Sequence, residues 1–250
     1  MSSSVVCRKA FEEPAGTNLA GIPTTNLELD SPLMTYGAPY DELCAKHIQN
    51  TFHASRVYII ASGTLSHQTD GVERLISSIG RDRVVGVKKG MAQHTPWTDI
   101  IEITNECREL HVDCIVTLGA GSLTDGGKII VLALANDITT TEQLARYSIE
   151  STSVPANVKR PVVPLITIPT SLSGGEYFSL AGGTDPVTHH KQGFLYSGMG
   201  SKLVILDAEL CTTTPPYYWY STGFRSLDHC VEALCCLTGT AKSDEKASRG

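Results

Sequence analysis

The residues whose types and spacing best suit chemistry lie in the stretch 113–128, which reads DCIVTLGAGSLTDGGK. Its apolar start, Cys114 to Leu118, predicts a buried strand, and Gly119-Ala120-Gly121-Ser122 predicts a tight turn into a helix. Such a turn lets a ligand approach the backbone, and a helix start offers unpaired N–H groups to an anion. Ser122 is the expected N-cap of the helix. The stretch therefore predicts a diphosphate site, although an ordinary strand–turn–helix corner has the same pattern.

A second stretch with chemical potential is 168–176, IPTSLSGGE, which directly follows a predicted strand. Thr170 and Ser171 supply hydroxyls and the two glycines supply room, a combination suited to holding a ribose or a nicotinamide amide. A polar connecting loop is the alternative interpretation of the same residues.

A third stretch is a predicted helix over 217–237. Arg225 and His229 are four residues apart and share one face of this helix, whereas Asp228 and Glu232 share another. A histidine on such a helix is most often a packed or solvated side chain. Chemistry here therefore needs independent support.

The elements that would position these residues alternate along the chain. Apolar periodicity predicts helices over 40–52, 68–79, 96–110, 142–147 and 217–237, and strands over 56–61, 83–87, 114–118, 162–168 and 203–207. This alternation predicts an α/β fold with a doubly wound, mostly parallel sheet. Right-handed crossovers then bring the turns after the strands to one edge, where ligands bind.

Composition narrows the class of protein. A net charge of −6 without a basic cluster argues against nucleic acid as a partner. We expect no membrane span, because the chain has no apolar run of sufficient length, and Phe11-Glu12-Glu13-Pro14 interrupts any signal-peptide core. The eight cysteines form no CxxC pair, so we expect reduced thiols in a cytoplasmic protein rather than disulfides or a zinc site.

In their order and spacing, these stretches resemble the iron-containing alcohol dehydrogenase family, which has a dehydroquinate-synthase-like fold. The family pattern is a strand, GGGS, two residues, D, two residues, K; then PTT and a glycine-rich turn ending in SE; then a strand ending in Asp; then G-x-D-x-x-x-H-x-x-E. The matching residues are Gly119–Ser122 with Asp125 and Lys128, Pro169–Ser171 through Glu176, Asp207, and Gly223 through Glu232. The agreement runs from about Tyr36 to the last residue.

The resemblance implies an oxidoreductase that uses NAD or NADP. The cofactor-binding residues that it implies are Ser62, His94, Gly119, Ala120, Gly121, Ser122, Asp125, Thr170, Ser171 and Lys191. Gly121, Ser122 and their neighbours would hold the diphosphate, and Thr170 and Ser171 would contact the nicotinamide half. Lys191 matches the family's cofactor-contacting lysine.

Two further positions bear on the adenosine half. His94, in His94-Thr95-Pro96, stands where many members have Asn-Pro-Thr beside the adenosine. Ser62 stands where NAD-preferring members have an Asp, which accepts from the ribose 2′-OH and repels a 2′-phosphate. A serine does neither strongly, so the resemblance allows NADPH as well as NADH.

The chain also departs from the family pattern. Metal-using members bind iron or zinc through the Asp and His of G-x-D-x-x-x-H and two later histidines, but Arg225 occupies the Asp position here. A guanidinium would repel a cation. Asp228 cannot replace that ligand, because it points about 100° away from His229 on the helix. We therefore expect no catalytic metal.

The maleylacetate reductase branch, which works without metal, matches these motifs best. In such a site Arg225 could stabilise negative charge on the substrate or bind its carboxylate, and His229 could donate the proton. Alternatively, Arg225 pairs with Asp228 or Glu232 on its own helix.

We expect three segments and one main function. The segments are an irregular N-terminal stretch over 1–33, an NAD(P)-binding α/β domain over 34–207, and the first helices of an incomplete α-helical catalytic domain over 208–250. The function is hydride transfer between nicotinamide and a small-molecule alcohol, carbonyl compound or activated double bond, with a homodimer as one option. The alternatives are a metal-dependent alcohol dehydrogenase and a truncated dinucleotide-binding fragment without activity.

Overall fold

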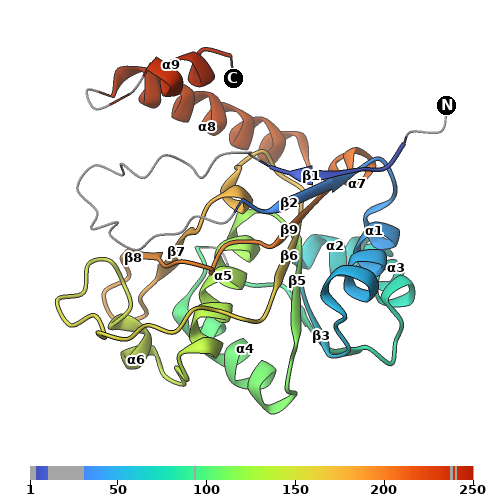
Figure 1. Ribbon diagram of the computed structural model, residues 1–250, viewed down its shortest axis with the longest axis horizontal. Helices are drawn as coiled ribbons and strands as arrows, with labels where there is room; N and C mark the ends of the chain where they lie inside the picture. Colours follow the sequence, from blue (N-terminus) through green and yellow to red (C-terminus); the bar gives the residue numbers. More distant parts are fainter. Residues whose placement is uncertain (1–3, 11–30, 93, 237–238, 240, 250) are drawn as a thin grey trace.

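A seven-stranded sheet forms the centre of the molecule (Figure 1). The structure is a computed structural model, and it describes residues 4–10, 31–92, 94–236, 239 and 241–249. In spatial order, the strands are β1 (Val6–Lys9), β2 (Leu33–Tyr36), β9 (Leu203–Leu206), β6 (Leu165–Pro169), β5 (Cys114–Gly119), β3 (Val57–Ala61) and β4 (Val84–Lys89). All neighbours are parallel except β1 and β2, so the predicted mostly parallel sheet is confirmed.

Helices cover both faces of the sheet. One face carries α1 (Tyr40–His47), continued by a π-helical turn (Ile48–Phe52), α2 (Gly63–Gln68), α3 (Gly71–Ile79) and α7 (Ala208–Cys211). The other face carries α4 (Trp97–Glu109), α5 (Gly121–Ala135) and α6 (Thr141–Ala145). The sheet is therefore doubly wound, as predicted.

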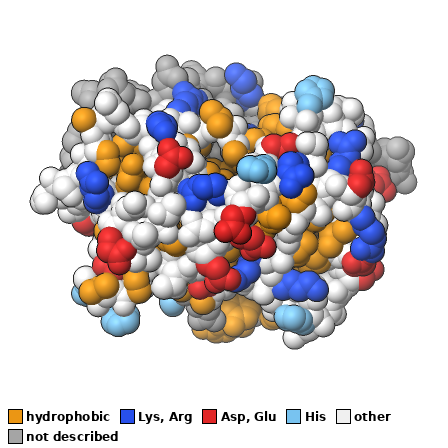
Figure 2. All heavy atoms as spheres, turned by 90° about the horizontal axis from the view of Figure 1, so that it is seen from below, with side chains coloured by type: hydrophobic (Ala, Val, Ile, Leu, Met, Phe, Trp, Pro, Cys, Tyr) orange, Lys and Arg blue, Asp and Glu red, His pale blue; other side chains and the backbone are white. Residues whose placement is uncertain are grey.

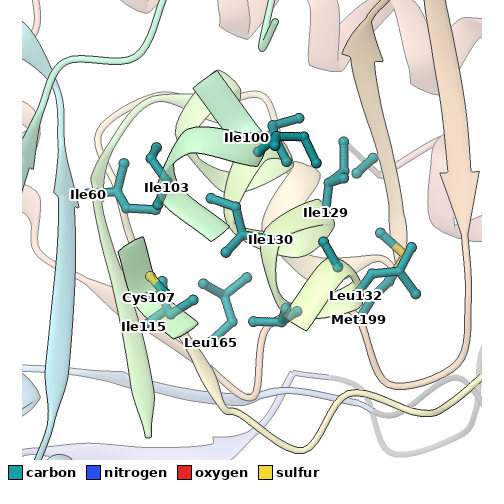
Figure 3. Close-up of a cluster of buried hydrophobic side chains, with 14 of the residues drawn as sticks. Ile60, Ile100, Ile103, Cys107, Ile115, Ile129, Ile130, Leu132, Leu165 and Met199 are labelled. Atoms are coloured by element: carbon teal, nitrogen blue, oxygen red, sulfur yellow. The ribbon is translucent and has the colours of Figure 1, made fainter. Parts of the chain in front are cut away.

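Strand β3 illustrates why the sheet is covered on both sides. All five of its residues, VYIIA, are buried. Because side chains alternate along a strand, Tyr58 and Ile60 enter one core cluster, whereas Val57, Ile59 and Ala61 enter the other. Figure 3 shows the first cluster, where Ile60 and Ile115 from the sheet face isoleucines of α4 and α5.

The remaining elements lie outside this three-layer body. The hairpin of β7 (Leu180–Thr184) and β8 (Lys191–Leu195) packs against α5, after a single 3₁₀ turn (Gly175–Tyr177). Helix α8 (Pro216–Cys235) and helix α9 (Ala241–Ala247) lie beyond the carboxyl edge of the sheet, at the top of Figure 1.

Some predictions about the elements were wrong. The segment 1–33 was expected to be irregular, yet Val6–Lys9 forms an edge strand and Leu33 begins the next one; residues 11–30 lie outside the described part of the chain. The edge strand forms because it pairs antiparallel with β2. A four-residue sequence does not by itself indicate that such a partner is present. Helix α2 was missed because six residues are too few for a helical period.

The charge distribution on the surface and the apolar character of the helices are relevant to the expectation of no nucleic-acid and no membrane partner. Acidic and basic side chains are intermixed over the face shown in Figure 2. Among the described residues, no helix combines the length and apolar character needed to cross a membrane.

Candidate active site

The carboxyl edge of the sheet brings the first two predicted stretches together with Ser62. Ala61 is paired with Leu118, and Gly119 is paired with Pro169. Ser62, Ala120 and Thr170 follow these strands directly, so they emerge side by side at one edge. Thr170 N also donates to Gly119 O at 3.1 Å, which joins the second stretch to the turn.

Two glycines of the turn between β5 and α5 have different roles. Gly119 has φ of +147°, and a Cβ there would lie 2.7 Å from Leu123 Cδ1 and 2.9 Å from Ser62 Cβ, so the turn itself requires glycine. A Cβ on Gly121 would meet only the end of a side chain, Ser173 Oγ, at 2.8 Å. Gly121 therefore keeps open the space above the turn.

The prediction that Ser122 is the N-cap of the helix was wrong. Ala120 is the N-cap, with extended backbone (φ −82°, ψ 177°), and Ser122 already lies in the first turn of α5. The reason is that Gly121 already adopts helical geometry, which places the helix start two positions earlier than predicted. An alanine cap gives no side-chain hydrogen bond to the first N–H groups, and such groups can serve a bound anion.

A charged network lies further along α5. Lys128 is fully buried, and its Nζ donates to Gly175 O at 2.5 Å and to Leu180 O at 2.7 Å. Asp125 lies 3.7 Å from Lys128 Nζ through Oδ1 and 3.6 Å from Lys191 Nζ through Oδ2. Burial lowers the pKa of Lys128, and Asp125 opposes this shift. Two of the predicted cofactor-binding residues, Asp125 and Lys191, are thus in contact.

The loop after β6 contains two residues that the sequence analysis quoted within a motif but did not assign to the site. Ser173 Oγ lies 3.1 Å from Ser171 Oγ and faces Gly121, so it lines the space above the turn. Glu176 is buried, and this burial raises the pKa of its carboxyl. The type of a loop residue, whether it carries a hydroxyl or a carboxylate, does not indicate which distant side chains it will contact. For Lys128, the spacing of the family pattern was the available sequence signal.

The two residues expected near the adenosine both lie near the turn between β5 and α5. Ser62 caps α2 by accepting from Leu65 N at 3.2 Å, with its Cβ against Gly119. His94 is exposed, and its neighbour Thr95 donates from Oγ1 to Ser122 O at 3.1 Å. Both predicted residues are therefore adjacent to the first turn of α5.

Arg225 and His229 lie apart from this group, on α8. Arg225 forms an ion pair with Asp228 and lies 3.8 Å from a carboxylate oxygen of Glu232, while His229 Nδ1 lies 3.0 Å from the other oxygen. The alternative in which Arg225 pairs within its own helix is therefore the observed arrangement. The four side chains are each about half exposed.

Helix α8 is nevertheless attached to the loop after β6. Leu172 N donates to Thr222 Oγ1 at 3.1 Å, and Ser226 Oγ donates to Leu172 O. One loop residue thus links the turn region to the helix that carries Arg225 and His229.

The residues of α8 do not fit a metal ion. Arg225 occupies a ligand position of the family pattern, and its charge is directed at two carboxylates that would otherwise be candidate ligands. Within the described part of the chain, no three His, Cys, Asp or Glu side chains are grouped as a metal site.

A cavity of about 680 Å³ lies elsewhere on the carboxyl edge, between the ends of β2 and β9. Its lining residues, none of them a predicted site residue, are Arg8, Met34, Tyr36, Gly37, Ala38, Pro39, Leu206, Asp207, Ala208 and Glu209.

The doubly wound sheet with a glycine turn at the start of α5 defines the class of α/β proteins that bind ligands at the carboxyl edge. Residues 40–208 match the model for iron-containing alcohol dehydrogenases, and the chain belongs to that family. Family membership confirms the resemblance drawn from the motifs.

Individual relatives agree with this membership. Dehydrogenase FUM7 of Gibberella moniliformis is 37% identical over 215 residues, which cover 84% of this chain and 50% of the relative. Maleylacetate reductase from Agrobacterium tumefaciens has the same fold, with a TM-score of 0.65 at 24% identity over 86% of this chain and 51% of that chain.

A third comparison concerns a structure with a cofactor. Sulfoacetaldehyde reductase from Bifidobacterium kashiwanohense, solved in complex with NAD+, has a TM-score of 0.68 at 20% identity, over 80% of this chain and 50% of that chain. The chain spans about half the length of the relatives it matches.

Proposed function

We propose that this protein is an NAD(P)-dependent oxidoreductase that transfers a hydride between nicotinamide and a small alcohol, carbonyl compound or activated double bond. The observation that carries the proposal is the start of α5, where Gly119 and Gly121 leave the turn open and Ala120 leaves the first N–H groups without a side-chain cap. A diphosphate suits such a helix start. A cytosolic location and a homodimer belong to the same proposal.

The neighbouring residues give the cofactor an orientation. Ser62 and His94 lie near the turn, where the adenosine half would lie. Thr170 and Ser171 follow the next strand of the sheet, on the side where the nicotinamide half would lie. Asp125 and Lys191, which contact each other near α5, would hold the sugar and phosphate groups between the two halves.

The family supports a nicotinamide cofactor. A sulfoacetaldehyde reductase of the same fold was solved with NAD+, and a 28% identical relative is an NAD-dependent methanol dehydrogenase. When bound, nicotinamide supplies or accepts the hydride. The protein must then stabilise charge on the substrate oxygen and supply a proton.

Arg225 and His229 are the residues proposed for those tasks. The imidazole of His229 is oriented by Glu232, whose carboxylate oxygen lies 3.0 Å from Nδ1, so it can hold the proton. Arg225 can donate to a developing oxyanion, but it shares its charge with Asp228 and Glu232. The two neighbouring acids reduce the attraction of Arg225 for any negative charge, whether on a substrate oxygen or on a free carboxylate.

Gly121→Val tests the proposal with little risk to the fold. The new side chain would displace the flexible Ser173 hydroxyl and fill the space above the turn, whereas any change at Gly119 would strain the backbone. Dinucleotide binding, measured by NAD(P)H fluorescence, should be lost.

Gly223→Ala in α8 is the matched control, since its Cβ would make an ordinary 3.4 Å contact with Leu172. It should bind like the parent chain. Parent-like NADH and NADPH binding by the Gly121 variant would show that the diphosphate site lies elsewhere.

A second candidate function is a dinucleotide-binding protein without turnover. It is favoured by α8, which carries the proposed catalytic residues and whose every residue is at least partly exposed. Cofactor binding without turnover of any alcohol or carbonyl compound would support it. A metal-dependent alcohol dehydrogenase is the third candidate. It would be supported by iron or zinc bound to the purified protein.

A further inference from the structure

The backbone before α4 adopts a rare conformation beside the proposed cofactor site. His94 and Thr95 have φ of +67° and +56°, so two consecutive non-glycine residues are left-handed. Threonine is β-branched and seldom adopts this region, and Pro96 restricts the residue before it further. Such a kink persists only where surrounding contacts hold it.

A single residue of the β7–β8 hairpin contacts both peptides of the kink. Thr184 Oγ1 donates to His94 O at 2.8 Å, and Thr184 N donates to Thr95 O at 3.0 Å. A β-bridge between Thr184 and Pro96 extends the contact to the start of α4. The end of β7 thus holds the kink in place through its side chain and its backbone.

The kink in turn contacts the first turns of α5. Thr95 is only 1% exposed, and its Oγ1 donates to Ser122 O, next to the open glycine turn. The Thr95 methyl group lies 3.3 Å from the position of a Cβ on Gly126. The position of the kink therefore determines one wall of the space around Ser122.

The hairpin reaches α5 by a second route. Lys191 is the register partner of Thr184 across β7 and β8, and its Nζ lies 3.6 Å from Asp125 Oδ2. Gly182 N also donates to Asp125 Oδ2 at 3.3 Å. The hairpin consequently contacts the nucleotide helix at Asp125 and, through the kink, at Ser122.

We propose that Thr184 is a positioning residue for the adenosine–diphosphate half of the cofactor site. It holds His94 and Thr95 in their left-handed conformation, and Thr95 then fixes the wall beside Ser122. This inference rests on the proposed dinucleotide function. It predicts that loss of the Thr184 hydroxyl affects one half of the cofactor and not the other.

Three variants of the 250-residue chain separate this role from a general effect on the hairpin. Thr184→Val removes the hydroxyl at nearly constant shape, and Thr184→Ser retains it. Thr188→Val is the matched control, because Thr188 Oγ1 donates to Asp185 Oδ2 at 2.9 Å in the same hairpin.

The first measurement is hydrogen exchange without cofactor. Thr184→Val should accelerate exchange at residues 94–98 and 121–125, whereas Thr184→Ser and Thr188→Val should leave both segments like the parent. Unchanged exchange in the Thr184→Val chain would overturn the proposal, because the hydroxyl would not be holding the kink.

The second measurement is the dissociation constant of NADPH and of its two halves. Thr184→Val should weaken ADP-ribose and NADPH about fivefold, the change expected for one ordinary hydrogen bond. Binding of reduced nicotinamide mononucleotide should stay within twofold of the parent, and Thr184→Ser should restore both affected ligands.

The remaining outcomes have distinct meanings. Faster exchange with unchanged affinities would make the contact structural and overturn the positioning role, as would equal weakening of both halves. A parent chain that binds neither ADP-ribose nor NADPH would instead overturn the proposed function, and the positioning role with it. The exchange measurement would still report whether Thr184 holds the kink.

Discussion

Ser62 is the residue at which the choice between NADH and NADPH can be tested. Its hydroxyl already accepts from Leu65 N, and it carries no charge to repel a 2′-phosphate. We expect the chain to bind NADPH within about a hundredfold of NADH, or about 2.7 kcal/mol. Ser62→Asp should raise the NADPH dissociation constant at least tenfold, because a carboxylate would face the phosphate.

The control for this change is the affinity for NADH, which Ser62→Asp should keep or strengthen, because aspartate can also cap α2 and can accept from the ribose 2′-OH. A parent chain that prefers NADH by more than a hundredfold would show that another group discriminates against the phosphate.

The cysteines provide a second test at the residue scale. Burial raises the pKa of Cys107 to about 12, so about one part in ten thousand is thiolate at pH 8. Cys7 and Cys235 are exposed. A thiol-specific disulfide reagent at pH 8 should modify Cys7 and Cys235 within minutes, and Cys107 only after unfolding. Equal rates for all three in the native chain would contradict the buried environment of Cys107.

The sequence predicted some site residues better than others. Gly119 and Gly121 could be found because a turn after a β-branched strand leaves a local pattern. Ser173 and Thr184 could not, since each acts through a contact with a distant segment and its hydroxyl leaves no local sequence pattern. The N-cap was misplaced at Ser122 because capping preference alone does not reveal where helical geometry begins.

Among the elements, α8 determines whether metal chemistry is available. At roughly 4 Å, the Arg225 charge would cost a divalent cation several kcal/mol at an effective dielectric near 20. His229 alone is too few ligands for a stable site. Elemental analysis of protein purified without added metal should therefore show substoichiometric iron and zinc, with the same result for His229→Ala.

A finding of bound metal would also have a specific interpretation. One equivalent of iron or zinc that disappears in the His229→Ala chain would restore the metal-dependent alcohol dehydrogenase as the main candidate. Metal that persists in this variant would instead be bound elsewhere.

Element prediction succeeded where burial imposes a pattern. Strands β3, β5 and β6 have almost continuous apolar runs because helices cover both of their faces. The hairpin β7–β8 was missed, since LAGGT and KQGFL contain glycines and have little apolar periodicity. Its pairing depends on contacts with α5 and the kink at His94, which only the folded chain provides.

At the scale of the whole molecule, the sheet with its covering helices differs from α8 in how far apolar side chains are buried. The sheet and its helices enclose two cores, whereas α8 exposes apolar residues at spacings of three and four: Tyr217, Tyr220, Phe224, Leu227, Val231 and Leu234. These side chains are 46–76% exposed and form one stripe. Thr222 and Ser226, which contact Leu172, lie on the opposite face of the helix.

This stripe leads to a prediction about the chain in solution. An exposed row of large apolar side chains favours association, because each fully buried one contributes about 1.5–3 kcal/mol. We expect concentration-dependent self-association at tens of micromolar, on the order of 6–7 kcal/mol, measured by sedimentation equilibrium. Phe224→Glu combined with Leu227→Glu should shift the chain toward monomer, whereas Val187→Glu, at an 82% exposed site in the distant hairpin, should not. A parent chain that stays monomeric at about 100 µM would contradict the homodimer, and equal effects of both variants would assign the association to net charge.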